Sequence, residues 1–129
     1  MAKYVNDIIL DLGLNYIKTL TTRFNACIGV PANYTEAVTN FPTGKKCSSA
    51  TVNSSNFTGP IDATSGRKLT TSAISGITVD VSGTADHIAL VDTVNLTLLA
   101  IVSLSASVVV IAGNSMTINP FDINIQDPI

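Results

Sequence analysis

His87 is the only histidine of the chain, and Asp86 lies beside it. A hydrolase with a Ser-His-Asp arrangement would need this pair, because the carboxylate orients the imidazole. Adjacent residues of a strand point to opposite faces of a sheet, so the sequence predicts that Asp86 and His87 do not face each other. The chain has no G-x-S-x-G motif to hold a nucleophilic serine. We therefore expect His87 at a strand edge or an interface, and we expect no enzyme.

Cys27 and Cys47 are the two cysteines, and with one histidine they match no zinc-ligand spacing. They can form one disulfide at most, and reduced thiols are the default without a secretory signal. Carboxylates are scattered without a calcium-loop spacing, at Asp62, Asp80, Asp86, Asp92 and Asp122. A carboxylate pair for glycoside hydrolysis stays open, but no pair stands out. Because no phosphate-binding loop is present either, the sequence predicts no metal and no cofactor.

The chain has a net charge of −2 and seven Lys and Arg residues. Two adjacent basic pairs, Lys45-Lys46 and Arg67-Lys68, do not extend into the continuous basic stripe that is typical of nucleic-acid binding. We therefore expect no nucleic-acid partner. Each basic pair is interpreted either as a solvated turn or as a contact with an acidic partner surface.

The C-terminal part of the chain is almost free of charge. Between Ile88 and Ile129 the charged residues are Asp92, Asp122 and Asp127. Only 12% of the whole chain is charged, where roughly 25% is usual for a globular domain. Such a segment needs burial in a β-fold, in a partner or in lipid, and a surface this poor in charge is typical of a protein covered by neighbours.

The stretch from Leu96 to Gly113 is about as long as the roughly 18 apolar residues of a membrane-spanning helix. Its run of β-branched residues at Val108–Ile111 and its alternating serines favour strands instead. Its flanks also lack the basic and aromatic residues of a membrane anchor. We expect no membrane partner, and we predict two buried strands joined around Leu104 to Ser107.

The N-terminus has a helical period, so residues 1–22 are predicted as a helix. The main apolar stripe, which is expected to lie on the chain's own sheet, contains Val5, Ile8, Ile9, Leu12, Tyr16 and Leu20. Leu10, Leu14 and Ile17 lie off that stripe. We interpret them as a second face that can dock on another subunit.

Residues 23–66 are predicted as a short strand followed by an extended arm. Phe24, Ala26 and Ile28 alternate with polar residues, whereas the stretch from Pro31 to Pro60 has few apolar anchors. Tyr34 to Val38 can form one helical turn. The arm either orders against a neighbour or remains a plain loop, and its candidate interface residues are Tyr34, Phe41 and Phe57.

Residues 67–129 read as short strands separated by turns every eight to twelve residues, which is typical of an antiparallel sandwich or barrel. The predicted fold is a single mainly β domain, an antiparallel β-sandwich of jelly-roll type with one N-terminal amphipathic α-helix and a long loop or arm. No parallel βαβ pattern and no internal repeat is present.

Several turn and core patterns together are similar to those of a known group of proteins. They are Tyr4-Val5 through Leu14-Asn15-Tyr16-Ile17, Ser65-Gly66-Arg67-Lys68, Gly83 through Asp92, Leu98-Leu99-Ala100, Ala112-Gly113-Asn114, Phe121-Asp122-Ile123 and Asp127-Pro128. With them the chain resembles small virion structural proteins of tailed bacteriophages over nearly its whole length. The resemblance implies capsid decoration, in which a subunit cements the seams between major capsid hexamers. It supplies no functional motif, so it implies no particular binding residues.

The expected function is therefore that of a head decoration, or cement, protein. Its expected partners are the major capsid protein and further copies of itself, as a trimer or a dimer, and its expected location is the capsid surface after synthesis in the cytoplasm of a bacterial host. The alternatives are a tail or neck subunit (tube, adaptor or fibre attachment), a carbohydrate-binding sandwich and a hydrolase. The absence of Trp disfavours the carbohydrate-binding alternative, because such modules stack sugars on exposed aromatic rings.

Overall fold

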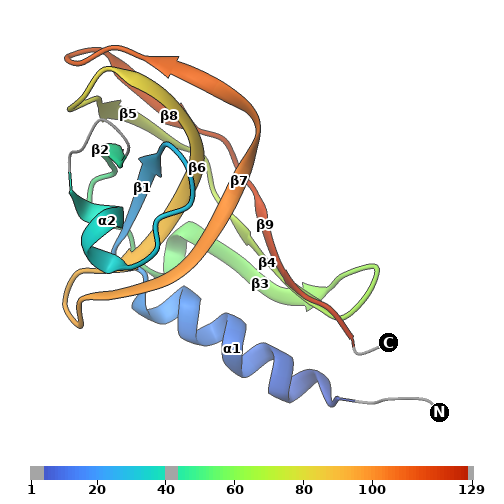
Figure 1. The fold of residues 1–129 in the computed structure, drawn as a ribbon. Coiled ribbons are helices and arrows are strands. Elements are labelled where there is room, and N and C mark those ends of the chain that lie inside the picture. Colours follow the sequence, from blue (N-terminus) through green and yellow to red (C-terminus); the bar gives the residue numbers. More distant parts are fainter. Residues whose placement is uncertain (1–4, 40–43, 128–129) are drawn as a thin grey trace.

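The computed structural model of the chain describes residues 5–39 and 44–127. Figure 1 shows one long helix below a set of antiparallel strands, so the fold is mainly β, as the sequence predicts. The elements are α1 (Asp7–Leu20), β1 (Arg23–Cys27), α2 (Tyr34–Val38), β2 (Lys45–Ser48), a 3₁₀ turn η1 (Ser54–Asn56), β3 (Phe57–Asp62), β4 (Arg67–Thr71), β5 (Ile74–Thr78), β6 (Gly83–Asp92), β7 (Thr97–Val110), β8 (Ser115–Ile118) and β9 (Asp122–Ile125).

The strands form three antiparallel sheets. Their orders are β2-β1-β6-β7, β3-β4-β9 and β5-β8. These sheets are open, so the pairing alone does not define the two-layer jelly roll that the sequence predicts. The turns at Ala112-Gly113 and Asn119-Pro120 separate β7, β8 and β9, as predicted from their turn residues.

β1 and β6 form the centre of the largest sheet and are buried on both faces. Phe24 lies opposite Leu90 in the register and belongs with it to the main core. The neighbouring pair, Asn25 and Ala89, faces the other side, where α2 covers a smaller cluster. In the second half of β6, where both faces are buried, Ile88 to Val91 form a continuous apolar run, which agrees with the strand predicted there.

The helix predicted at the N-terminus is present, but the prediction of its buried face is wrong. Asn6 caps α1 by accepting a 2.9 Å hydrogen bond from the Ile8 amide. Leu10 and Leu14, expected to face another subunit, are buried within the chain, and Ile17 packs on the same core. At Gly13 an added Cβ would lie 3.1 Å from the Ile125 Cδ1 atom, so glycine permits the close approach of α1 to β9.

The region predicted as an extended arm folds onto the chain's own sheet in its described part. The predicted helical turn is α2, but β2 was not predicted, and it pairs with β1 from Asn25↔Ser48 to Cys27↔Lys45. The Lys45-Lys46 pair hid this strand, because both residues read as solvated. Lys46 is only 1% exposed, and the Lys45 ammonium lies 3.1 Å from the Asp80 carboxylate. The interpretation of this pair as a solvated turn is therefore wrong.

β7 is a single strand of 14 residues, not two strands joined at Leu104 to Ser107. No Gly, Pro or Asn lies between Thr97 and Val110 to make a turn, so the chain continues and bulges instead. The register with β6 passes from His87↔Ser103 directly to Ala85↔Val108. Most of its second half is exposed, so the prediction of burial is also wrong for the chain taken alone.

The stretch weighed as a membrane-spanning helix thus lies in β7 and the turns on either side of it. Among residues 5–39 and 44–127, none of the helices combines the length and the apolar character that crossing a bilayer requires.

Candidate interaction surfaces

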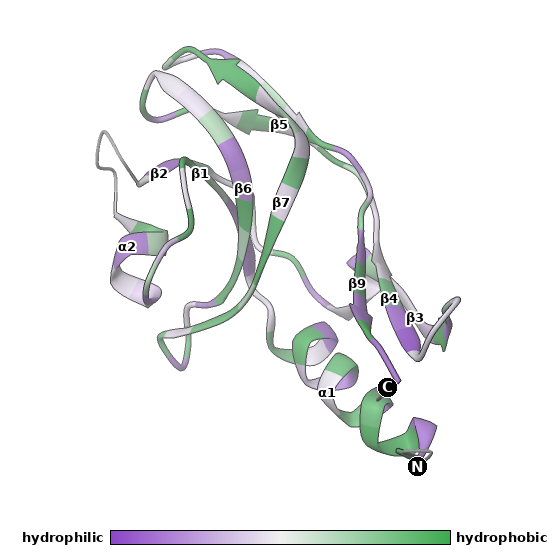
Figure 2. Cartoon of the chain, turned by 45° about the vertical axis from the view of Figure 1, so that its right-hand side comes forward, coloured by the Kyte–Doolittle hydropathy of each residue, from purple (hydrophilic) through white to green (hydrophobic). Residues whose placement is uncertain are grey.

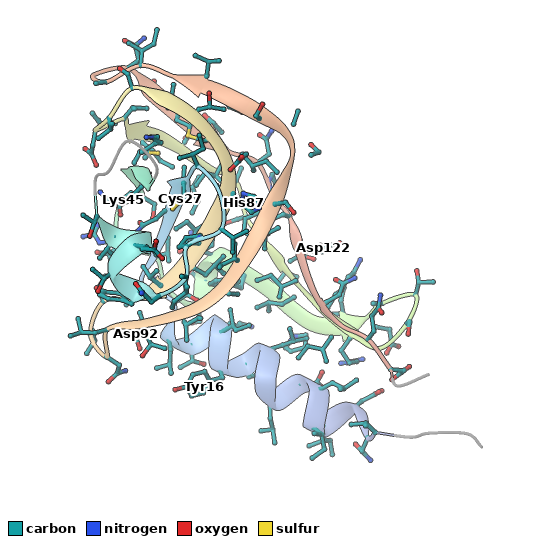
Figure 3. All side chains as sticks on the ribbon, viewed as in Figure 1. Tyr16, Cys27, Lys45, His87, Asp92 and Asp122 are labelled. Carbon is teal, nitrogen blue, oxygen red and sulfur yellow. The ribbon has the colours of Figure 1, made fainter. Side chains whose placement is uncertain are left out.

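The outer face of α1 exposes a stripe of large apolar side chains, here called the outer α1 face. It consists of Ile8, Ile9, Leu12 and Tyr16, which are between 58% and 66% exposed. At about 100° per residue these four positions fall within one narrow arc, nearly opposite the buried Leu10 and Leu14. Figure 2 shows hydrophobic colouring along this helix, and Figure 3 shows Tyr16 on its side away from the strands.

Two of the three charged residues of α1, Asp11 and Lys18, contact the chain's own strands. Asp11 binds Arg67 of β4 through both carboxylate oxygens, at 2.8 Å to Nε and 3.3 Å to Nη2. Lys18 donates a 2.8 Å hydrogen bond to the Gly59 carbonyl. Hydrogen bonds to Asp11 and then to Asp62 raise the pKa of Arg67 above its usual value. The helix is therefore held to the sheet by polar contacts as well as by its core residues, while its solvent side exposes four large apolar side chains.

A second uncharged surface, here called the β7–β8 surface, lies where β7 faces β8 and the turn after it. It contains a groove of about 450 Å³ between residues 102–108 and 116–121. No Lys, Arg, Asp or Glu lines this groove. Beside it, at the β7–β8 turn, Val109 is 79% exposed and Ile111 is 56% exposed.

The β6–β7 turn makes a third apolar projection, with Val94 79% exposed and Leu96 65% exposed. Asp92 holds this turn, because its carboxylate accepts hydrogen bonds from the Val94 amide and from the amide and side chain of Asn95. The side-chain bond from Asn95 is the main reason that the pKa of Asp92 is lowered. Leu96 adopts a φ of +55°, which a leucine rarely does, so the polar turn fixes an apolar tip in place.

The prediction for Asp86 and His87 is wrong. The His87 Nδ1 atom lies 2.7 Å from Asp86 Oδ1, because the register shifts between Ala85 and His87 and the alternation of faces is interrupted there. The Gly29 amide donates a 2.7 Å hydrogen bond to the same carboxylate oxygen. The bond with His87 and then the bond from Gly29 lower the pKa of Asp86.

Cys27 lies opposite His87 in the register of β1 and β6. Together with Asp86, these two residues have the residue types of a Cys-His-Asp catalytic triad. A nucleophilic cysteine requires a lowered pKa. Burial raises the pKa of Cys27 to about 11, and Cys27 is completely buried against α2. Its thiol is also positioned toward the carbonyls of Asn25 and Ala37. These properties are those of a packed core thiol.

The two cysteines are free and lie on opposite faces of the sheet. Cys47 belongs to the main core, with its thiol 3.5 Å from the Met116 sulfur, whereas Cys27 belongs to the cluster under α2. We predict that neither thiol reacts with a thiol-specific aromatic disulfide reagent at pH 8 in the native protein, and that both react in denaturant. A disulfide between them, detected by mass spectrometry of the native protein, would contradict this placement.

The six interface residues predicted from the sequence do not form one surface. Leu10, Leu14 and Phe57 are buried in the core, and Phe57 packs edge to face on Phe24 at 5.7 Å. Tyr34 is half-buried beside the cluster under α2. Ile17 is half-buried, and Phe41 lies outside the described residues. The outer α1 face was visible in the sequence as the main apolar stripe, but that stripe had been assigned to the interior.

Within the described ranges, no three His, Cys, Asp or Glu side chains gather where they could hold a metal ion. Comparison of the chain with protein-family models, curated proteins and solved structures gives no match. Function is therefore inferred from the residues and geometry of this chain and from the resemblance described above.

Proposed function

We propose that this chain is a non-enzymatic structural protein of a tailed-bacteriophage virion, and specifically a head decoration protein that bridges major capsid subunits. The outer α1 face carries the proposal. A helix that binds its own sheet through Leu10, Leu14 and the Asp11–Arg67 pair, yet exposes isoleucines, a leucine and a tyrosine to solvent, is built to be covered by a partner. The resemblance supplies the identity of that partner, the major capsid protein.

The energetics favour a repeated, individually weak contact. Burying one Leu or Ile side chain contributes about 1.5–3 kcal/mol, so the four residues of the outer α1 face contribute on the order of 6–12 kcal/mol before costs. Association costs about 4–15 kcal/mol in lost rigid-body freedom. The net binding free energy of one subunit is therefore small. When several linked subunits bind the same shell, their combined affinity is much higher than that of one subunit. A bridging subunit of this kind adds contact area that must be lost before a pressurised head opens.

The finer parts of the proposal concern architecture and assembly. The open sheets pack as a jelly-roll-like sandwich, and the subunit forms a small homo-oligomer, a trimer at local threefold positions or a dimer. It is made in the bacterial cytoplasm and acts on the capsid surface, without nucleic acid, membrane or cofactor. A position in the tail or neck would use the same outer α1 face, and the position of the bound protein on the particle distinguishes the two.

The test is co-sedimentation of the purified protein with pre-formed empty heads of the phage that encodes it. We expect Leu12→Asp to bind at least about tenfold more weakly than the wild type, because a charge replaces an apolar side chain at the contact. Thr35→Asp is the matched control, since Thr35 is an exposed helical position in α2. Binding of Leu12→Asp at wild-type affinity, or absence of wild-type binding, would overturn the proposal.

A further inference from the structure

β7 has one edge without a strand beside it. It pairs with β6 on one side, and no described strand pairs with the other. A free edge presents a row of unpaired amide and carbonyl groups, which natural proteins protect with Lys, Pro or a very short strand. β7 is 14 residues long and contains no proline and no charged residue. Its only protective device is the bulge, so this edge requires a cover.

The bulge adds to this requirement. Residues 104–107 have no counterpart on β6, because the register passes from Ser103 directly to Val108. These four residues nevertheless remain extended, and Leu104, Ser105 and Ala106 form part of the wall of the groove. An extended segment without a ladder partner inside the chain can pair with a strand outside it.

The surroundings of the edge are apolar and uncharged. Between Asp92 and Asp122 the sequence has no charged residue. The groove next to the edge is lined by apolar residues, such as Val102, Leu104, Met116 and Phe121, and by uncharged Ser, Thr and Asn residues. Figure 1 shows β7 arching across the molecule. A partner strand with charged side chains would lose their hydration here without gaining an opposite charge.

We propose that the free edge of β7 pairs antiparallel with β7 of a second copy of this chain across a two-fold axis. The sheet β2-β1-β6-β7 then continues into its counterpart, and apolar side chains of each copy cover the groove of the other. This dimer contact uses a surface separate from the outer α1 face, so it does not depend on binding to a capsid.

Two properties favour a second copy as the occupant. A two-fold axis perpendicular to a sheet brings identical edges together antiparallel, so that each amide row meets a carbonyl row. The second copy also presents the same charge-free segment, so no charge is desolvated on either side, and a net charge of −2 gives little repulsion between copies. A self-paired edge is isologous and closes after two copies, which selects the dimer over the trimer.

The experiment is the mass of the full chain in solution, by light scattering and native mass spectrometry. The wild type is expected to be a dimer. Ser105→Pro places a residue without a backbone amide at an exposed position of β7 that has no counterpart on β6, so it is expected to give a monomer with an unchanged circular dichroism spectrum. Ser105→Lys adds a charge at the same edge and is expected to raise the dimer dissociation constant at least about tenfold.

Ser75→Lys is the matched control, because Ser75 is an exposed serine in β5 and the variant should remain a dimer. A wild-type monomer at submillimolar concentration, a trimer, or a dimer that persists in both Ser105 variants would overturn the self-pairing. If Ser105→Pro fails to fold, Ser105→Lys decides. Leu12→Asp should remain a dimer. Head binding is therefore tested by Leu12→Asp in co-sedimentation, and self-pairing is tested separately by the Ser105 variants in the mass measurements.

Discussion

Leu14→Ala is expected to lower the free energy of unfolding by about 2–5 kcal/mol, whereas Leu12→Ala should change it by less than about 0.5 kcal/mol. The Leu14 side chain is 0% exposed and belongs to the main core, so its removal leaves a cavity. Leu12 is 61% exposed on the same helix. Both variants have the same helix propensity change, so urea denaturation of the pair isolates the effect of burial.

This pair of variants tests which face of α1 the fold uses. Equal losses in the two variants would contradict the orientation of the helix and, with it, the outer α1 face as a docking surface. A large loss of unfolding free energy in Leu12→Ala alone would indicate that Leu12 faces the sheet, as the sequence pattern predicts. The expected asymmetry would leave the four exposed residues free for a partner.

Gly66→Ala is expected to lower the free energy of unfolding by at least about 2 kcal/mol, because two costs combine there. Gly66 has a φ of +74°, which alanine adopts only with strain. An added Cβ would also meet the Ile125 carbonyl and the backbone of Gln126, which hold the β3–β4 turn against β9. Thermal or urea unfolding measures the loss.

Gly76→Ala is the control for the conformational part of this effect. Gly76 has a φ of +70°, but an added Cβ there meets no atom within 4 Å. We expect a loss of about 1 kcal/mol for this variant. If Gly66→Ala were no more harmful than Gly76→Ala, the close packing of the β3–β4 turn on the C-terminal strand would be refuted.

The elements that the sequence predicts well are those in which local pattern and tertiary environment agree. The helical period predicts a helix over residues 1–22, and the structure has α1 at Asp7–Leu20. The alternation at Met116 and Ile118 predicts a strand, which is β8 with both residues buried. The second half of β6 was predicted from an apolar run that ends at Asp92. A strand that is buried on both faces has apolar residues at successive positions, with no polar alternation.

The errors have physical causes that a single sequence does not reveal. α1 is apolar on two nearly opposite faces, so its pattern cannot indicate which face meets the sheet; the small Gly13 next to Ile125 and the Asp11–Arg67 pair decide it. β2 was not predicted because Lys45 and Lys46 read as exposed residues. Lysine is rarely buried without a partner, and the Lys45 ammonium has one in the Asp80 carboxylate.

The candidate surfaces were accessible to sequence analysis only in part. The scarcity of charge after Ile88 predicts a region that needs a cover, and that stays a prediction, whereas the strand break placed at Leu104 to Ser107 concealed the long free edge of β7. The contact between Asp86 and His87 was not predictable, because it depends on a bulge, and bulges leave no clear pattern in a sequence.

Electron cryomicroscopy of empty heads incubated with the purified protein tests the central claim most directly. The claim predicts density for this subunit at regular positions on the head lattice, with the outer α1 face, Ile8, Ile9, Leu12 and Tyr16, against the shell. Bare heads, density confined to the neck or tail, or bound subunits whose α1 faces solvent would contradict it.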